Sequence, residues 1–314
     1  MKVLVLFGGK SFEHDISLKS VNFVINNIDI DYTLVGIDKN GEWFEIKKVN
    51  VDSDWKNNII NKVNNIIEFA KKFDIVLPII HGNSVEDGKL QSMFELFNIK
   101  YVGSNSFSSL ISYDKILTKL ILEKYSIPQV PYYIYNKSLN FDEIKYPVIV
   151  KPAKCGSSIG ITICYNKNEL KKAIKLARNY DSNILIEKYI ENSRELECAI
   201  IEKKSNIITS NVGEILKDSW YSYEAKYKLK NETVISNIDN SIKKDIKKYS
   251  EKIFNILGCK KISRVDFLYD LDNHKLYFNE INTMPGLTDI SMYPKLLNNL
   301  GISNKKIIET LLDI

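Results

Sequence analysis

Residues 264–282 hold the amino-acid types with the clearest potential for chemistry in this chain. Two runs that read as strands flank Asp272-Asn273, a pair that favours a tight turn. Because side chains two residues apart on a strand share a face, a hairpin closed by this turn gathers four polar side chains on one face. These four are Arg264, Asp266, Glu280 and Asn282. The apolar residues between them point to the other face, where we expect a hydrophobic core.

The predicted register of this hairpin places Asp266 opposite Glu280 and Arg264 opposite Asn282. Two facing carboxylates repel each other unless a cation lies between them. Carboxylate and amide oxygens suit Mg²⁺ better than Zn²⁺, so these residues predict a magnesium site. The arginine beside them indicates that a second anion, such as a phosphate, comes to the same place. The alternative is a charged hairpin face in water, which the apolar opposite face disfavours.

A second chemical signal is the segment VIVKPAKCGSSIG, residues 148–160, which reads as a strand, a loop and a second strand. Lys151 ends the first strand as a point charge. The loop carries Gly156, Ser157, Ser158 and Gly160. Its glycines allow backbone amides to turn towards an anion, and its serines add hydroxyl donors. An ordinary glycine-rich turn is the alternative, because the segment lacks the GxxxxGK[ST] spacing of a phosphate-binding P-loop.

Two loops near the amino terminus follow strands and precede helices. HGNSVEDG, residues 81–88, leads into a helix that begins at Lys89, and Glu13 lies in the corresponding loop after the first strand. The carboxyl end of a strand that leads into a helix is a common anion site in open α/β sheets. His81 is therefore a candidate carboxylate ligand, and the two loops are expected to converge. The alternative is a capping loop with a structural histidine.

Hydrophobic periodicity predicts the elements that must position these loops. Strands and helices alternate over about the first 100 residues, which predicts an open parallel α/β sheet. The pattern predicts helices over residues 56–69 and 109–125 and, further along, a long amphipathic helix over 241–257. No internal repeat or coiled coil is evident.

Composition restricts the class of protein. The chain has 314 residues, 44% hydrophobic and 26% charged, which is typical of a soluble globular protein of about two domains or one large composite. A net charge of +5 favours small anionic ligands and falls short of a nucleic-acid footprint. The four cysteines form no CxxC pair, and no apolar run approaches the ~20 residues of a membrane span. We therefore expect a reduced, cytoplasmic protein without nucleic-acid or membrane partners.

Arginine is rare in this chain, and lysine supplies almost all of the positive charge. The arginines are Arg178, Arg194 and Arg264. Where arginine is kept, its planar fork is expected to matter.

Taken in order, these motifs resemble the D-alanine–D-alanine ligase family of the ATP-grasp superfamily. The matching stretches, between residues 8 and 288, are GGKSFEHDIS, HGNSVEDG, SYDKILTK, VIVKPAKCGSSIG, ILIEKYI with RELE, YEAKY, and RVDF with FNEINTMPGLT. The resemblance implies an ATP-grasp fold of three subdomains. These are an N-terminal α/β substrate-binding part at 1–103, a central part with the phosphate loop at 104–184, and a C-terminal part with the metal hairpin and a lid loop at 185–314.

The resemblance also implies a site for ATP between the last two parts, with two Mg²⁺ ions that Mn²⁺ can replace. The implied nucleotide contacts are Lys115, Lys151, Ser157, Ser158, Glu187, Glu195 and Lys226. The implied metal ligands are Asp266, Glu280 and Asn282, with Glu280 bridging the two ions.

For the substrates, the resemblance implies that Glu13 meets the ammonium of the first D-alanine and His81 its carboxylate, while Arg264 holds the oxyanion. A hydrogen-bonded triad of Glu13, Ser157 and Tyr227 would tie loop, lid and N-terminal part together, with Lys226 on the same lid. The remaining implied substrate contacts are Gly286, Ser291 and Met292. Val85 stands where the family usually has glycine, so we expect the loop around His81 to differ in shape.

The implied activity is the ATP-dependent joining of two D-alanine molecules through an acyl phosphate, for peptidoglycan precursors, by a homodimer. Two alternatives stay open. One is a related ligase that joins D-alanine to D-serine or D-lactate, although the lid sequence Glu224-Ala-Lys-Tyr227 resembles the dipeptide-forming type. The other is a nucleotide-binding module without catalysis.

Overall fold

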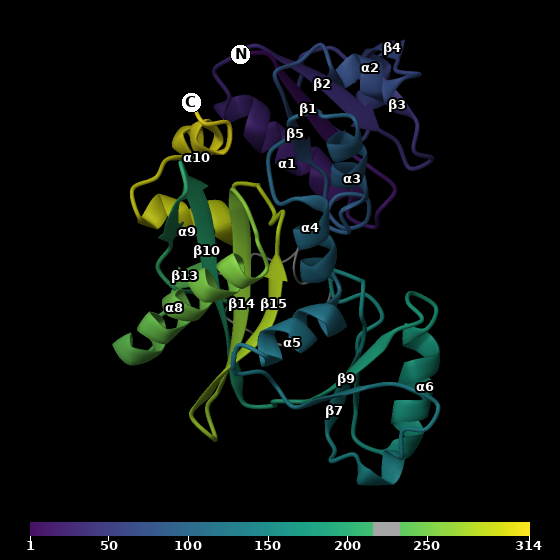
Figure 1. The fold of residues 1–314 in the computed structure, drawn as a ribbon, viewed down its shortest axis with the longest axis vertical. Helices are drawn as coiled ribbons and strands as arrows, with labels where there is room; N and C mark the ends of the chain where they lie inside the picture. Colours follow the sequence, from purple (N-terminus) through teal and green to yellow (C-terminus); the bar gives the residue numbers. More distant parts are fainter. Residues whose placement is uncertain (216–232) are drawn as a thin grey trace.

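The computed structural model describes residues 1–215 and 233–314, and these ranges form three β-sheets with their covering helices (Figure 1). The sheets follow one another along the chain, which confirms the expected α/β composite. No helix in these two ranges is long and apolar enough to cross a lipid bilayer.

The first sheet has the strand order β4-β3-β2-β1-β5. Its elements are β1 (Val3–Gly8), α1 (His14–Asn27), β2 (Tyr32–Ile37), β3 (Trp43–Ile46), β4 (Ile59–Lys62), α2 (Ile66–Ala70), β5 (Ile75–Ile79) and α3 (Lys89–Leu96). β1 pairs in parallel with β2 and β5, as predicted, and each of its residues is buried, as is typical of a central parallel strand. β3 and β4 extend the sheet in antiparallel fashion, which the sequence reading missed.

The single helix expected over residues 56–69 is wrong. That stretch contains a short 3₁₀ turn (Trp55–Asn58), then β4, and only then the five-residue helix α2. Asn65 caps α2 by accepting a hydrogen bond from the backbone amide of Glu68. An asparagine at this position starts a helix rather than continuing one, so local capping and sheet pairing overrode the apolar spacing.

The second sheet is antiparallel, with the order β6-β9-β7-β8. Its strands and associated helices are α4 (Ser106–Tyr113), α5 (Lys115–Glu123), β6 (Tyr132–Ile134), β7 (Val148–Pro152), β8 (Thr162–Cys164), α6 (Lys167–Ala177) and β9 (Ile184–Lys188). Residues 153–161, between β7 and β8, are called the Gly/Ser loop below.

The helix expected over residues 109–125 is broken into α4 and α5 at Asp114. Asp114 has an extended backbone, and its carboxylate accepts hydrogen bonds from the amides of Ile116 and Leu117. This cap begins a new helix whose first residue is Lys115, and that placement matters for the site.

The third sheet has the order β13-β12-β10-β14-β15, with β11 also paired to β10. Its elements are β10 (Ser193–Lys203), β11 (Asn206–Thr209), β12 (Gly213–Ile215), β13 (Thr233–Ile235), α8 (Asn240–Ile256), β14 (Ile262–Asp270) and β15 (Lys275–Asn282). Helix α8 packs on this sheet through buried Ile253 and Phe254, which share a core with Val265, Phe267 and Ile281 of the hairpin. The expected apolar face of the hairpin is therefore confirmed.

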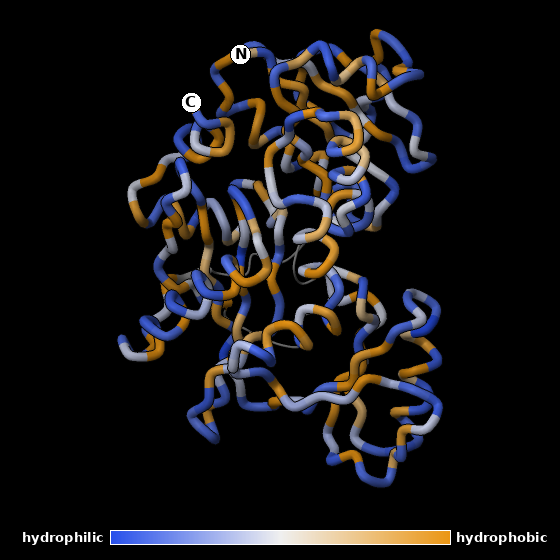
Figure 2. Tube along the Cα trace, viewed as in Figure 1, coloured by the Kyte–Doolittle hydropathy of each residue, from blue (hydrophilic) through white to orange (hydrophobic). Residues whose placement is uncertain are grey.

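Two C-terminal helices, α9 (Met292–Asn299) and α10 (Asn304–Leu311), join the first sheet to the third. Leu297 and Leu311 belong to the same core as β1, and the Tyr293 hydroxyl donates to the carbonyl of Ile200 in β10 at 2.9 Å. Figure 2 shows the corresponding hydropathy, with hydrophobic stretches along the inner strands and hydrophilic residues over the outer loops. The first and third sheets thus hold a fixed relation, which positions the N-terminal loops near the hairpin.

Candidate functional site

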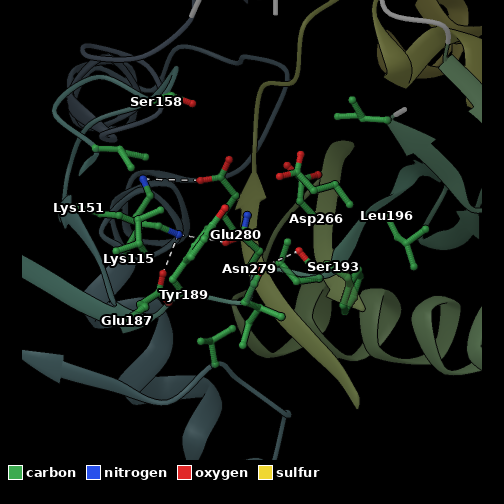
Figure 3. Close-up of a pocket in the computed structure, with 18 of the residues that line it drawn as sticks. Lys115, Lys151, Ser158, Glu187, Tyr189, Ser193, Leu196, Asp266, Asn279 and Glu280 are labelled. Carbon is green, nitrogen blue, oxygen red and sulfur yellow. Dashed lines mark hydrogen bonds and ion pairs between the residues drawn. The ribbon is translucent and has the colours of Figure 1, made fainter. Parts of the chain in front are cut away.

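A cavity lies between the second and third sheets, with the Gly/Ser loop on its border (Figure 3). Among the residues selected from the sequence, those that line it are Lys115, Lys151, Gly156, Ser157, Ser158, Glu187, Glu195, Asp266 and Glu280. These residues come from six different elements and the loop. Within the described ranges, the structure therefore brings the expected nucleotide-side residues and two of the expected metal ligands to one space.

The predicted hairpin register is confirmed, with Asp266 opposite Glu280 and Arg264 opposite Asn282. The turn, however, closes between Asp270 and Lys275. Regular pairing from that turn would place Asp266 opposite Asn279 instead of Glu280. A β-bulge next to Asp266 supplies the difference, because Phe267 pairs with Phe278 and leaves Asn279 as the extra residue. As a result both Asn279 and Glu280 line the cavity.

A third carboxylate, missed in the sequence reading, extends this row. Glu197 on β10 pairs directly with Asp266 on β14, so Glu197, Asp266 and Glu280 follow one line across three strands. The Arg264 guanidinium binds Asp266 through two hydrogen bonds of 2.7 Å and lies 3.0 Å from Glu197. Glu197 follows Glu195 by two residues and therefore shares its face of an otherwise apolar strand. This spacing was the signal in the sequence that could have identified Glu197.

The residues present fit a hard divalent cation by their donor chemistry. Asp266 and Glu280 supply carboxylate oxygens, and Asn282 donates its amide nitrogen to Asp266 at 3.1 Å, which leaves its amide oxygen. Across the two described ranges, no three His, Cys, Asp or Glu side chains converge as a metal site by themselves. Mg²⁺ often takes only one or two carboxylates and completes its shell with phosphate oxygens and water. The arrangement therefore suits an ion that arrives with a phosphate ligand.

Lys115 connects the hairpin to the Gly/Ser loop. Its backbone amide donates to the carbonyl of Ala153, and its ammonium donates to the carbonyl of Cys155 at 2.9 Å and lies 3.7 Å from Glu280. Figure 3 shows Lys115 directed towards the hairpin side of the cavity. The Asp114 cap fixes the start of α5 and so holds this lysine at the cavity.

Lys151 and Glu187 form a buried ion pair at the other wall. Lys151 lies 2.6 Å from Glu187 and 3.3 Å from the Asn279 amide oxygen. Lys119, four residues after Lys115 and only 1% exposed, lies 2.6 Å from the second oxygen of Glu187. Burial alone would raise the pKa of Glu187, but the two lysines hold it at about 2. Burial would likewise lower the pKa of Lys151, and Glu187 raises it instead.

The Gly/Ser loop touches the N-terminal part of the chain through Ser157. Its hydroxyl donates to the Glu13 carboxylate at 2.5 Å. The glycines were expected to turn the backbone of this loop, and Gly160 does so with a positive φ of 73°, whereas Gly156 does not. Ser157 and Ser158 also have positive φ angles, of 55° and 58°. A Cβ on Gly156 would lie 3.4 Å from Glu13, an ordinary van der Waals distance, so neither the backbone angle nor the surrounding space requires glycine at this position.

His81 is buried, and both ring nitrogens have protein partners. Nε2 lies 2.8 Å from the Ser20 hydroxyl, and Nδ1 lies 3.0 Å from the carbonyl of Met284. Because a carbonyl only accepts, Nδ1 carries the proton and Nε2 accepts from Ser20. Burial lowers the pKa of His81, against smaller opposing effects of Glu13 and the Met284 carbonyl, so the ring is neutral at pH 7. In this loop Gly82, Ser84 and Gly88 have positive φ, whereas Val85 does not and is buried.

The other expected substrate residues lie beyond β15. A Cβ on Gly286 would lie 2.9 Å from the Ser291 hydroxyl, which itself bonds Thr288 at 2.6 Å. Met292 is 7% exposed and belongs to the core shared with the first sheet, so its side chain is not brought to the cavity wall. Lys226 and Tyr227 lie outside the described residues.

Two of the three arginines form planar forks, as expected. Arg264 donates two hydrogen bonds to Asp266. Arg194 donates to Glu214 through Nε and Nη2 and also donates to Asn237 at 2.7 Å. Arg178 is exposed at the end of α6, where its backbone amide closes the helix.

Comparison with known sequences gives a consistent result. Residues 2–104 match the model of the D-ala D-ala ligase N-terminus, and residues 121–313 match that of the D-ala D-ala ligase C-terminus. The chain is 38% identical to a D-alanine–D-alanine ligase B of Clostridium tetani, over its whole length and 93% of the relative. It is 37% identical to a D-alanine–D-alanine ligase of Acetivibrio thermocellus, over its whole length and 95% of the relative.

Solved structures share the fold. The VanG D-Ala:D-Ser ligase of Enterococcus faecalis superposes with a TM-score of 0.87 at 30% identity, over 99% of this chain and 98% of that one. The D-alanine–D-alanine ligase of Bacillus anthracis, complexed with ATP, gives 0.79 at 28% identity, over 100% and 96%. These matches agree with the site geometry, and the chain belongs to the D-alanine–D-alanine ligase family, which is a family of ATP-dependent ligases.

Proposed function

We propose that this chain uses ATP in the cavity between the second and third sheets to join two D-alanine molecules for peptidoglycan precursors. One observation carries the proposal. Asp266 and Glu280 face each other on the hairpin, Lys115 lies 3.7 Å from Glu280, and all three line the cavity beside the Gly/Ser loop. Facing carboxylates next to ammonium groups suit a ligand of anionic phosphates with a bound cation.

The reaction needs this charge arrangement because a carboxylate is a poor acylating agent. Phosphoryl transfer from ATP converts the carboxylate of the first D-alanine into an acyl phosphate, whose leaving group is stable phosphate. Both reactants are negatively charged. Lys115 and Lys151 reduce that repulsion and align the two groups, while loop amides add donors.

Asp266, Glu280 and Asn282 would hold Mg²⁺, with Mn²⁺ as a substitute. Bound there, the ions would neutralise phosphate charge during transfer. Arg264 would hold the oxyanion that forms when the second amine attacks, and its fork is oriented by Asp266 and Glu197. Glu195, on the cavity wall, would meet the ribose side of the nucleotide.

On the substrate side, Glu13 would meet the ammonium of the first D-alanine, with Ser157 donating to it across the cavity border. His81 is neutral and its ring nitrogens are bonded to Ser20 and Met284, so it would act by positioning the surrounding backbone rather than as a cation. Tyr227 and Lys226 would close over the site, and Gly286 and Ser291 would shape the second-substrate side, with Met292 packed in the core behind them. We also propose that the protein works as a cytoplasmic homodimer.

D-serine is a second candidate for the second substrate. The observation that favours it is the TM-score of 0.87 with the D-Ala:D-Ser ligase VanG, over nearly the whole of both chains. Sequence relatives at 37–38% identity are instead D-alanine–D-alanine ligases, which favours D-alanine.

The test is product analysis with the purified chain, ATP and Mg²⁺. We expect ADP release that requires D-alanine and does not occur with L-alanine, and D-alanyl-D-alanine as the main product. Addition of D-serine or D-lactate decides between the alternatives, because a mixed product in excess would replace the D-alanine assignment. ADP release without any amino acid would contradict the ligase function.

A further inference from the structure

We propose that Lys119 is a positioning residue for phosphate binding, because its ion pair with Glu187 leaves the buried group Lys119–Glu187–Lys151 with one net positive charge. This inference rests on the proposed binding of ATP in the cavity and adds a residue that does not itself line that cavity.

The geometry makes Glu187 the shared partner of two lysines. Lys119 reaches one carboxylate oxygen and Lys151 the other, both at 2.6 Å. The Lys119 side chain is 1% exposed, and the ring of Tyr132 lies 5.1 Å from its ammonium. Lys119 is therefore enclosed, and any effect on a ligand must pass through Glu187 to Lys151, which do line the cavity.

The charge count gives Lys119 its function. With Lys119, two ammonium groups share one carboxylate, and Lys151 retains charge for an anion. Without Lys119, Glu187 and Lys151 form a neutral pair, and Lys151 is drawn wholly to Glu187. The low pKa of Glu187 is consistent with a carboxylate that stays ionised throughout. Lys119 is the largest of the effects that lower this pKa, so its removal leaves Lys151 alone to hold the carboxylate in its charged form.

A purely structural role for Lys119 is the competing explanation. A buried lysine carries a desolvation cost that an apolar side chain of similar size avoids, so packing alone does not require the charge. The two explanations differ in their effect on ligands. A structural role alters binding of every ligand of the cavity, whereas the positioning role alters only the part of the affinity that comes from phosphates.

The experiment compares the affinities of ATP with Mg²⁺ and of adenosine, measured by titration calorimetry on the full chain. The readout is the ratio of the adenosine Kd to the ATP Kd, which isolates the contribution of the phosphates. We expect Lys119→Met to lower this ratio roughly 10- to 100-fold, the size expected for losing a charge-assisted contact. Lys124→Met is the matched control, because Lys124 is exposed at the end of the same helix and should leave the ratio unchanged.

A second pair of variants keeps the test decisive if Lys119→Met alone does not fold. Glu187→Gln leaves two lysines without the carboxylate, and Lys119→Met with Glu187→Gln restores a single positive charge. We expect the double variant to have a ratio near that of the wild type, and Glu187→Gln alone to have a higher one. Any loss of adenine contacts affects both ligands and cancels in the ratio.

The outcomes separate this inference from the proposed function. Wild-type protein that does not bind ATP would overturn both. Wild-type protein that binds ATP, with Lys119→Met showing an unchanged ratio, would overturn the positioning role alone. Equal ratios in Glu187→Gln and the double variant would also overturn it.

Discussion

Replacing Glu280 with glutamine should separate activity from stability. In the structure two interactions of Glu280 oppose each other. Lys115 attracts it at 3.7 Å, and Asp266 repels it from the directly opposite strand position. With an effective dielectric constant of about 20, the attraction is about 4 kcal/mol and the repulsion, at the ~5 Å spacing of paired side chains, about 3 kcal/mol. These two charges leave a net attraction of about 1 kcal/mol. Lys151 and Arg264 also attract Glu280, so Glu280→Gln should lower the free energy of unfolding by at least that amount.

Turnover should respond far more strongly than stability. Glu280 would hold the metal ion that neutralises phosphate charge, and loss of one preorganised electrostatic group typically costs about 100- to 1000-fold in rate. The assay is D-alanine-dependent ADP release as a function of Mg²⁺ concentration, beside a thermal unfolding curve. Glu251→Gln, exposed on α8, is the control and should match the wild type in both. Magnesium-dependent turnover of Glu280→Gln near the wild-type value would refute the metal assignment, and a gain of stability would refute the charge balance.

Three further predictions concern the groups around the cavity. Asp114→Ala removes two cap hydrogen bonds, so the free energy of unfolding, measured with denaturant, should fall by about 1 kcal/mol. The KM for ATP should rise, because α5 then frays at Lys115. An unchanged KM would contradict this link. The pKa of Glu187 is depressed from 4.5 to about 2, so its contribution is complete above pH 4.5 and is lost as the pH falls towards 2, by about 3 kcal/mol in total. Glu187→Gln should lack this dependence, and parallel stability curves for variant and wild type between pH 7 and pH 3 would argue against it. Arg264→Lys keeps the charge but loses the fork on Asp266, so turnover should fall at least about 100-fold, whereas equal activity would show that the planar fork is dispensable.

The sequence was sufficient for the hairpin because alternation fixes which side chains share a face. Asp266 and Glu280 alternate with residues that are buried on the other side, and this pattern predicts the face that they share but not the register. The bulge at Asn279 was not predictable, since nothing in the local sequence distinguishes it from a regular strand residue. The pairing of Asp266 with Glu280 and of Arg264 with Asn282 therefore depends on this bulge, which the turn alone does not imply.

Helix boundaries failed where a polar residue inside an apolar pattern acted as a cap. Asp114 and Asn65 each begin a helix, although the hydrophobic spacing runs through them. A stricter use of capping chemistry would have divided both segments.

Pairs that form across the fold were the least accessible from sequence. Lys119 and Glu187 come from α5 and β9, and only the folded arrangement shows that they meet. The available hint was local, because Lys119 follows Ile116 by three residues and so shares the buried face of its helix. A lysine on that face is unusual enough to indicate a buried partner.

The central claim is that the protein transfers the terminal phosphoryl group of ATP, bound in the cavity, to the carboxylate of D-alanine. The most direct measurement uses D-alanine labelled with ¹⁸O in its carboxyl group, with mass analysis of the inorganic phosphate after turnover. Transfer through an acyl phosphate leaves one substrate oxygen in each phosphate, because the C–O bond breaks when the second amine attacks. We predict one ¹⁸O atom per phosphate released with the dipeptide, and unlabelled phosphate would contradict the account.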